Sequence, residues 1–316
     1  MEVKDNLYIN SLRALEKSNL KLVQYESSLF NSKKLEKLRK SSIKQSFQLA
    51  FKVINSKRIF KKTKVYNSSM SIENRTVEEF ERDLICNVDY YKKKIAVYTC
   101  VVGGYDKVND PIIINENIDY FVFSDQTIHS KIWKQKEIPE KILDLDNNIL
   151  INRYLKFHPE ELFQNYDFAV YIDGNVQVIS DITPLLKYTK NKLGVAFHSH
   201  SYRDSIYNEV EVLTKVVKRG DPTKLNKQVT AYRKEGFPDK YGLPEATIII
   251  TDLNNEKAAI FFDQWWEEFI RSRSFRDQVS LPYILWRNGI STDEVTLLGN
   301  NLRFSSKFIV KSHRLV

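Results

Sequence analysis

The tripeptide Asp173-Gly174-Asn175, which follows the apolar run 167–172, brings a carboxylate and an amide close together. Because a single glycine separates them, both side chains can point at one hard cation. Mg²⁺ and Mn²⁺ prefer such oxygen ligands and bridge protein carboxylates to a diphosphate. The same tripeptide also forms ordinary tight turns between strands. Taken alone it favours a turn, so the metal site depends on the residues around it.

Two further polar loops follow apolar runs. Gly103-Gly104-Tyr105 comes after the run 94–102, where a phosphate or nucleoside could bind, although the glycines match neither GxGxxG nor GxxxxGKS. Asp125 follows the next apolar run and could accept a hydrogen bond from a nucleobase. A plain glycine turn and a helix-capping aspartate explain the same residues without a ligand.

Charged residues on two helical stretches could complete such a site. Arg153 and Lys156 lie three residues apart and therefore share one helix face, where they either neutralise a diphosphate or form a solvated basic surface. Asp277 and Gln278 open the last long helical stretch. There Asp277 acts either as a helix cap or as a catalytic or acceptor-binding carboxylate.

A cluster of His198, His200, Arg203 and Glu209 follows the fourth apolar run. Two histidines beside an acid suit zinc, but His-x-His lacks the helical HExxH arrangement of zinc hydrolases. This cluster is nevertheless the candidate for activating a water molecule if the chain is a hydrolase.

Apolar runs and helical spacing alternate from residue 92 onward, which predicts an α/β domain with a mainly parallel sheet and helices on both faces. We expect strands at 94–102, 119–124, 167–172, 193–197 and 245–252, with a further strand at 176–179 if Asp173-Gly174-Asn175 is an ordinary turn. We expect helices at 147–163, 205–218, 223–235, 255–272 and 276–288. Ligands of such sheets gather at the carboxyl ends of the strands, where most of the polar residues above lie.

The first part of the chain has a different composition. Residues 5–64 contain neither Gly nor Pro and show helical spacing, and 31–64 carries twelve Lys or Arg against one acid. This net +11 exceeds the +9 of the whole chain, so the remainder is slightly acidic. Such a segment binds an anionic membrane surface, forms a solvated helical face, or forms an oligomerisation hairpin. We divide the chain into a helical, basic region at 1–90 and an α/β domain at 91–316.

The composition argues against several classes of protein. An apolar content of 42% argues against disorder, and Cys86 and Cys100 are too few for a disulfide framework. Residues 1–20 lack the apolar core of a signal peptide, and no stretch is long and apolar enough to span a bilayer. We therefore expect a cytoplasmic protein, peripheral on the inner face of the cell membrane if residues 31–64 bind lipid. We expect no nucleic-acid binding, because the basic charge is confined to one segment without a recognised motif.

In their order along the chain, these segments resemble the DUF616 (TOD1/MUCI70-like) glycosyltransferase-like domain. The matching stretches are Tyr98–Asp106, Phe123–Asp125, Asn152–Pro159, Tyr171–Asn175, His200–Glu209, Gly242–Glu245 and Arg276–Ser280. No single stretch is specific, but seven in the same order are hard to obtain by chance. The resemblance covers about residues 92–316 and does not extend to residues 1–90.

The resemblance implies a GT-A-type fold that binds a nucleotide-sugar donor with Mn²⁺ or Mg²⁺. Asp173 and Asn175 then stand at the DxD metal motif, with an amide in place of the second carboxylate and hence weaker metal binding, and His313 supplies a late ligand. Glu245 or Asp277 lies near the transferred sugar, with Asp277 favoured as the base of an inverting reaction. Donor binding is implied for Thr99, Gly103, Gly104, Tyr105, Asp125, Arg153, Lys156, His200, Arg203, Glu209 and Gln278.

We therefore expect a glycosyltransferase that moves a sugar from a nucleotide-sugar donor to a glycan or lipid-linked acceptor, in the synthesis of a surface polysaccharide. One alternative is a lipid-amide hydrolase, since ceramidase activity is attributed to a relative of this family. Another is a catalytically inactive sugar-nucleotide-binding protein. The leucine spacing within residues 7–30 also allows a homo-oligomer through the N-terminal helices.

Overall fold

The computed structural model describes residues 87–299, 302 and 305–311. The predicted basic segment 31–64 and the predicted metal ligand His313 lie outside the described residues. Within the described part of the chain, no helix has the length and apolar character needed to cross a membrane. The first described element is the short 3-10 helix η2 (Val88–Lys92), which leads directly into the sheet.

A six-stranded sheet with the order β3-β2-β1-β4-β7-β6 forms the centre of the domain. The strands are β1 (Ile95–Val101), β2 (Ile118–Ser124), β3 (Lys134–Lys136), β4 (Phe168–Ile172), β6 (Val195–Ser199) and β7 (Pro244–Asp252). β1 is parallel to β2 and β4, and β2 is parallel to β3, which confirms the predicted mainly parallel sheet. β7 instead runs antiparallel to its neighbours β4 and β6. The amino end of β7 therefore meets the carboxyl end of β4 at one edge of the sheet.

Both faces of the sheet are covered, which explains why β1 and β4 are buried at every position. Because successive side chains of a strand point to opposite faces, neighbouring residues of β1 enter different cores. Tyr98 belongs to a core cluster with Phe157 and Trp265. Val97 belongs to the other cluster, with Phe308.

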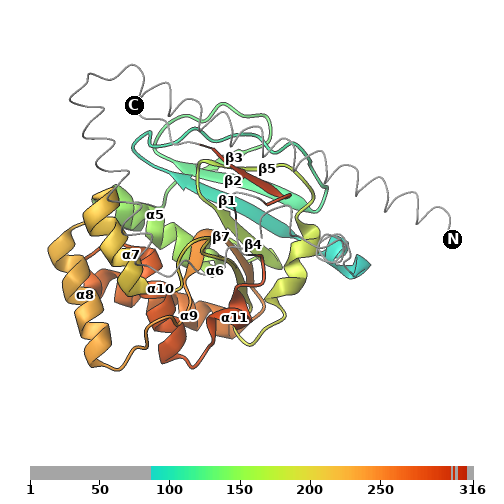
Figure 1. Ribbon diagram of the computed structural model, residues 1–316. Coiled ribbons are helices and arrows are strands. Elements are labelled where there is room, and N and C mark those ends of the chain that lie inside the picture. The colour runs from blue at the N-terminus through green and yellow to red at the C-terminus, as the bar shows by residue number, and fades with distance from the viewer. Residues whose placement is uncertain (1–86, 300–301, 303–304, 312–316) are drawn as a thin grey trace, which may run out of the picture.

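The helices are α4 (Glu140–Leu143), α5 (Asn148–Phe157), α6 (Pro159–Leu162), α7 (Ile206–Val212), α8 (Pro222–Lys234), α9 (Glu256–Ser272), α10 (Asp277–Arg287) and α11 (Thr292–Val295). The 3-10 helix η3 (Thr183–Thr189) and the π-helical turn η4 (Leu213–Val217) add to them. Figure 1 shows α7, α8, α9 and α10 gathered on one side of the sheet. The predicted helix 147–163 is interrupted at His158, because the following Pro159 disfavours helical backbone there.

A second, two-stranded sheet ties the C-terminal segment to the domain. β5 (Val176–Val178) pairs antiparallel with β8 (Phe308–Val310). The backbone N–H of Lys311 donates to the carbonyl of Asn175 at 2.9 Å, and Nδ2 of Asn175 donates to the carbonyl of Lys311 at 2.7 Å. The sequence did not predict β8, because three residues are too few to show a period.

Candidate functional site

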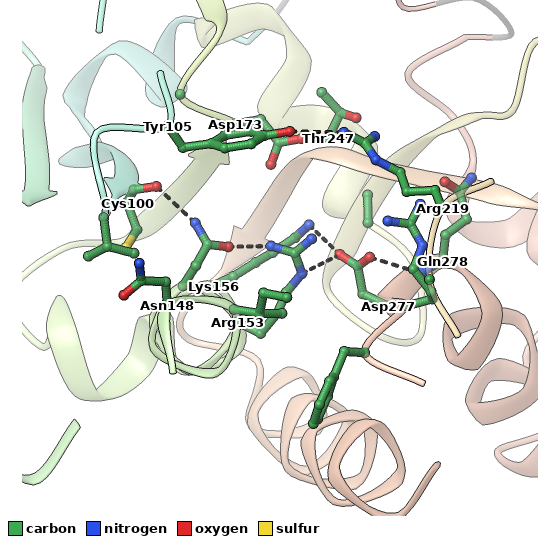
Figure 2. Close-up of a pocket in the computed structure, with 18 of the residues that line it drawn as sticks. Cys100, Tyr105, Asn148, Arg153, Lys156, Asp173, Arg219, Thr247, Asp277 and Gln278 are labelled. Carbon is green, nitrogen blue, oxygen red and sulfur yellow. Dashed lines mark hydrogen bonds and ion pairs between the residues drawn. The ribbon is translucent and has the colours of Figure 1, made fainter. Parts of the chain in front are cut away.

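A cavity of about 650 Å³ opens at the edge of the sheet where β1 and β4 end and β7 begins. Its volume lies in the usual range for small-molecule sites. The loop after β1, the helix α5, the turn after β4 and the segment 273–278 all contribute to its wall (Figure 2). The predicted site residues that line it are Gly103, Tyr105, Arg153, Lys156, Asp173, Asn175, Glu245, Asp277 and Gln278.

The turn after β4 is tight because Gly174 lies against the last residue of β1 and the loop that follows it. A Cβ atom at this position would lie 2.6 Å from Cγ2 of Val101 and 3.1 Å from Cβ of Asp106, so glycine fits where a larger residue would force a shift. Just before it, Asp173 accepts a hydrogen bond at 3.0 Å from the hydroxyl of the buried Tyr171. This bond orients the Asp173 carboxylate at the cavity.

The second residue of the expected metal pair also anchors β8. Asn175 is buried and its amide nitrogen donates to the carbonyl of Lys311, so its amide oxygen is the atom that could bind a metal. Among the residues that the structure describes, no three His, Cys, Asp or Glu side chains lie close enough together to hold a metal ion. Mg²⁺ is usually bound by one or two carboxylates together with substrate phosphates. Asp173 fits such a diphosphate-dependent site.

Three charged residues that are distant in sequence form an ion-pair cluster in the cavity wall. Oδ2 of Asp277 lies 2.9 Å from Nε of Arg153 and 2.8 Å from Nζ of Lys156. The Lys156 and Asp277 side chains are 2% and 9% exposed, whereas Arg153 keeps 21% of its surface accessible. Asn152 contacts Arg153 and also donates to the carbonyl of Cys100 at 2.8 Å, which anchors the cluster to β1. Figure 2 shows both cations pointing at Asp277.

This cluster changes the role expected for Asp277. Burial by itself would raise the pKa of the carboxyl, but Arg153 and Lys156 outweigh burial and hold that pKa well below its usual range. A carboxylate with so low a proton affinity is a poor general base, because an efficient base has a pKa near the working pH. The expectation that Asp277 deprotonates the acceptor therefore does not fit its environment.

Within the same cluster, the two cations that were expected to face a diphosphate differ in how accessible they are. Burial lowers the pKa of Lys156, although the nearby Asp277 opposes that shift. Lys156 is nearly inaccessible and neutralises Asp277, so it supports the cavity wall from behind. Arg153 remains partly exposed and is the member of the cluster that can reach a ligand directly.

Glu245 and Gln278 meet where β7 begins. Glu245 is half-buried, lines the cavity and accepts a hydrogen bond at 3.4 Å from Oγ1 of Thr247. Nε2 of Gln278 donates to the carbonyl of Pro244 at 3.2 Å, which ties the first turn of α10 to β7. Because β7 is antiparallel to β4, Glu245 lies at the same sheet edge as Asp173. Glu245, the second of the two predicted bases, therefore lines the same cavity as Asp173.

Three predicted donor-binding residues of the first two strands and their loops lie outside the cavity lining. Both Asp125 oxygens accept hydrogen bonds from the backbone N–H of Gly103, at 2.9 and 3.1 Å. Asp125 therefore holds the glycine loop in place. Thr99 is buried within β1, and Gly104 lies against the amide of Gln126. These residues shape the loop that presents Gly103 to the cavity.

His200, Arg203 and Glu209 form a separate cluster that also lies outside the cavity lining. The Arg203 side chain is paired with Glu209, and its Nη2 lies 3.0 Å from Nε2 of His200. Arg203 and Glu209 are both buried. This buried ion pair fits neither donor binding nor the activation of water that a hydrolase needs.

Four charged cavity residues were not singled out from the sequence. They are Arg219, Asp221, Lys224 and Arg273. Nη2 of Arg219 donates to the hydroxyl of Tyr105 at 2.8 Å and joins the loop before α8 to the loop after β1 (Figure 2). The sequence marks Arg219-Gly220-Asp221 as a loop between helices, but no local pattern indicates that this loop reaches the sheet edge.

Several solved glycosyltransferase structures are similar to part of this chain. The galactosyltransferase LgtC, in complex with donor and acceptor sugar analogues, is 14% identical over 59% of this chain and 69% of its own, with a TM-score of 0.34. Mouse xyloside xylosyltransferase 1 in its apo form is 7% identical over 64% of this chain and 83% of its own, with a TM-score of 0.36. The mannosyltransferase Ktr4p from S. cerevisiae is 10% identical over 62% and 66%, with a TM-score of 0.34. Because these TM-scores are low, the three structures do not indicate the role of any residue in this chain.

The family assignment rests on a longer match. No curated protein shows significant similarity to the chain. Residues 73–303, well over half of the sequence, match the family described as TOD1/MUCI70, glycosyltransferase-like domain. The match begins earlier than the resemblance at 92–316 and ends earlier, at residue 303, so it confirms the resemblance over residues 92–303. The chain therefore belongs to the TOD1/MUCI70 glycosyltransferase-like family.

Proposed function

We propose that this protein is an active glycosyltransferase that binds a nucleotide-sugar donor in the cavity and transfers the sugar to a glycan or lipid-linked acceptor, in the synthesis of a surface polysaccharide. The proposal depends on one observation in this member of a glycosyltransferase-like family. The cavity at the sheet edge contains both the oriented carboxylate of Asp173 and a cluster in which Arg153 and Lys156 pair with Asp277. That combination suits a nucleoside diphosphate leaving group, whose negative charge grows during the reaction.

The side chains then take distinct roles. A divalent cation bound with the donor would supply Lewis-acid stabilisation of the diphosphate, and Asp173 would hold it, oriented by Tyr171. Arg153 adds positive charge near the same group, and Asp277 keeps the Arg153 guanidinium in position. In an inverting reaction, Glu245 takes the proton from the acceptor hydroxyl.

The test begins with a conservative change at Asp173. Asp173→Asn keeps an oxygen that accepts the hydrogen bond of Tyr171 and removes only the negative charge. We expect transfer, or slow hydrolysis of the donor, to fall by more than about 100-fold, the scale of losing one electrostatic stabiliser. Asp173→Ala should abolish transfer while the protein stays folded, because one lost hydrogen bond costs about 1–3 kcal/mol.

The donor is identified first by a thermal-shift screen of nucleotide-sugars with and without Mn²⁺, followed by a hydrolysis assay. Asp293→Asn is the matched control, since Asp293 is exposed and lies outside the cavity lining. It should keep the wild-type melting temperature and rate. An Asp173→Asn or Asp173→Ala enzyme with full, metal-independent activity would sink the assignment. A nucleotide-sugar that binds without hydrolysis or transfer would instead indicate an inactive binding protein.

A further inference from the structure

The cavity has a second basic wall that the proposed donor chemistry leaves unused. Two segments form it: 218–224, the loop after η4 together with the first turn of α8, and 273–276, the loop between α9 and α10. The acid in these loops, Asp221, accepts hydrogen bonds from the backbone N–H groups of Thr223 at 2.8 Å and Lys224 at 3.2 Å, so it caps α8. The cavity-lining cations of this wall are Arg219, Lys224, Arg273 and Arg276. The wall therefore carries an excess of positive charge.

Arg276 is held within this wall with one donor group unsatisfied. A Cβ atom at Gly220 would lie 3.7 Å from Cγ and Cδ of Arg276, so the arginine stem packs against the glycine backbone. Gly220 has a φ of +83°, which side-chain-bearing residues rarely adopt. Nε of Arg276 is buried and has no hydrogen-bond partner among the described residues. A buried donor without a partner is costly, and a bound oxyanion would satisfy it.

Arg276 also lies among like charges. Burial lowers the pKa of its guanidinium; Asp277 opposes this, but Arg153 and Arg219 lower the pKa further. Asp277 is shared, because its Oδ2 already contacts Arg153 and Lys156. An anion between Arg276 and Arg219 would relieve this repulsion. Guanidinium groups suit that task, since their planar forks bind phosphate or carboxylate with two hydrogen bonds.

Backbone strain recurs in the same two loops. Lys218, Arg273 and Phe275 have φ values of +53°, +53° and +54°, in the left-handed region that disfavours residues with a Cβ atom. Lys218 and Arg273 take this conformation as the C-cap residues that end η4 and α9. These residues flank Arg219 and Arg276 and set where their backbones lie.

The two sets of cations differ in their links to the acids of the cavity. Arg153 and Lys156 are paired with Asp277, and Asp173 is among the charges that act on them. Arg276 precedes Asp277 in the chain and packs against Gly220 instead. The proposed donor site already assigns Asp173 and Arg153 to the diphosphate. An anion held by Arg219 and Arg276 is therefore left for the other substrate.

We propose that Arg219 and Arg276 bind an anionic group of the acceptor, a phosphate or a carboxylate, and thereby select an acidic acceptor. This inference rests on the proposed function, because it names the second substrate of the same cavity. It assigns Arg219 and Arg276 to acceptor specificity and leaves donor binding to Asp173 and Arg153.

The first experiment titrates inorganic phosphate into the full chain by calorimetry, with and without Mg²⁺ and a saturating nucleoside diphosphate chosen by the donor screen. Phosphate should bind in both conditions, and Arg276→Gln should weaken it at least about tenfold, as expected for one lost charge-assisted hydrogen bond. Arg287→Gln is the matched control, because Arg287 is an exposed arginine of α10 outside the cavity lining. Competition between phosphate and the nucleoside diphosphate, or unchanged phosphate binding in Arg276→Gln, overturns the proposal.

The second experiment compares transfer to a neutral methyl hexoside, its 6-phosphate and the matching uronate. One charged acceptor should be preferred by at least about tenfold in kcat/KM, and its identity separates phosphate from carboxylate recognition. Arg219→Gln and Arg276→Gln should remove that preference by raising the acceptor KM while the donor KM stays unchanged. Equal use of neutral and charged acceptors overturns the inference. If no nucleoside diphosphate binds, the proposed function fails, while the phosphate titration without nucleotide still tests the anion site.

Discussion

Replacing Asp277 with asparagine leaves two cations of the cavity wall without their shared carboxylate. The wild-type contacts are 2.9 Å to Nε of Arg153 and 2.8 Å to Nζ of Lys156, and the Lys156 side chain is 2% exposed. Removing one partner of a buried ion pair costs about 3–5 kcal/mol. Because Arg153 keeps 21% of its surface in solvent, we expect the lower end of the range, about 3 kcal/mol. For a domain of this size that is about 6–12 °C in Tm.

The assay is urea unfolding followed by circular dichroism, at pH 7 and again near pH 3. The folded-state pKa of Asp277 lies below its unfolded value, so the pairing contributes fully above the unfolded pKa and is lost as the pH falls through the folded pKa. The gap between wild type and Asp277→Asn should therefore narrow below about pH 4, without a change in the m value. Adding Lys156→Met to Asp277→Asn removes one stranded cation and should recover part of the loss.

Asp293→Asn serves as the control for removing a carboxylate from the surface, because Asp293 is exposed in the first turn of α11. It should keep the wild-type midpoint at both pH values. A wild-type midpoint for Asp277→Asn would refute the ion-pair reasoning. Strictly additive effects of Asp277→Asn and Lys156→Met would refute it as well, because residues in contact should couple.

Two further predictions concern Asn175 and Glu160. Asn175→Asp adds a potential metal ligand but places carboxylate oxygens against the carbonyl of Lys311. We therefore expect the free energy of unfolding in urea to fall by about 1–3 kcal/mol, with no gain in activity at low Mn²⁺. A more stable variant would contradict this. Burial raises the pKa of Glu160 to about 7, so its ionisation destabilises the folded state increasingly from about pH 4.5 up to pH 7. Glu160→Gln should therefore raise Tm by about 2–4 °C at pH 8 and leave it unchanged near pH 4, whereas a pH-independent difference would exclude this cause.

Local spacing was sufficient to predict most of the regular elements and one half of the site. The apolar run before Asp173 indicates a buried strand, and polar residues after such a strand lie at the sheet edge where ligands bind. The spacing of Arg153 and Lys156 likewise places them on one helix face. These inferences need only residues within a few positions of each other. The short strand β8 was not predicted, since three residues show no period.

The roles of these residues depended on partners that are distant in sequence. Asp277 was predicted to be a catalytic base because it is an acid at the start of a helix near the end of the domain. In the structure its carboxylate forms an ion pair with Lys156, which is 121 residues away in the sequence. The histidine cluster looked chemical because of its residue types, yet Arg203 and Glu209 are buried together. A pattern of residue types reports which side chains are charged, whereas proton affinity depends on burial and on neighbouring charges.

The alternation of strands and helices, the tight turn at Gly174 and the location of Asp173 after a buried strand can all be predicted from local residue patterns. The antiparallel direction of β7, which brings Glu245 to the same edge, became visible in the folded domain. The same holds for the meeting of the segments that carry Arg219 and Arg276 in one wall. Periodicity encodes which face of an element is buried, whereas strand direction and loop contacts follow from the packing of the whole chain.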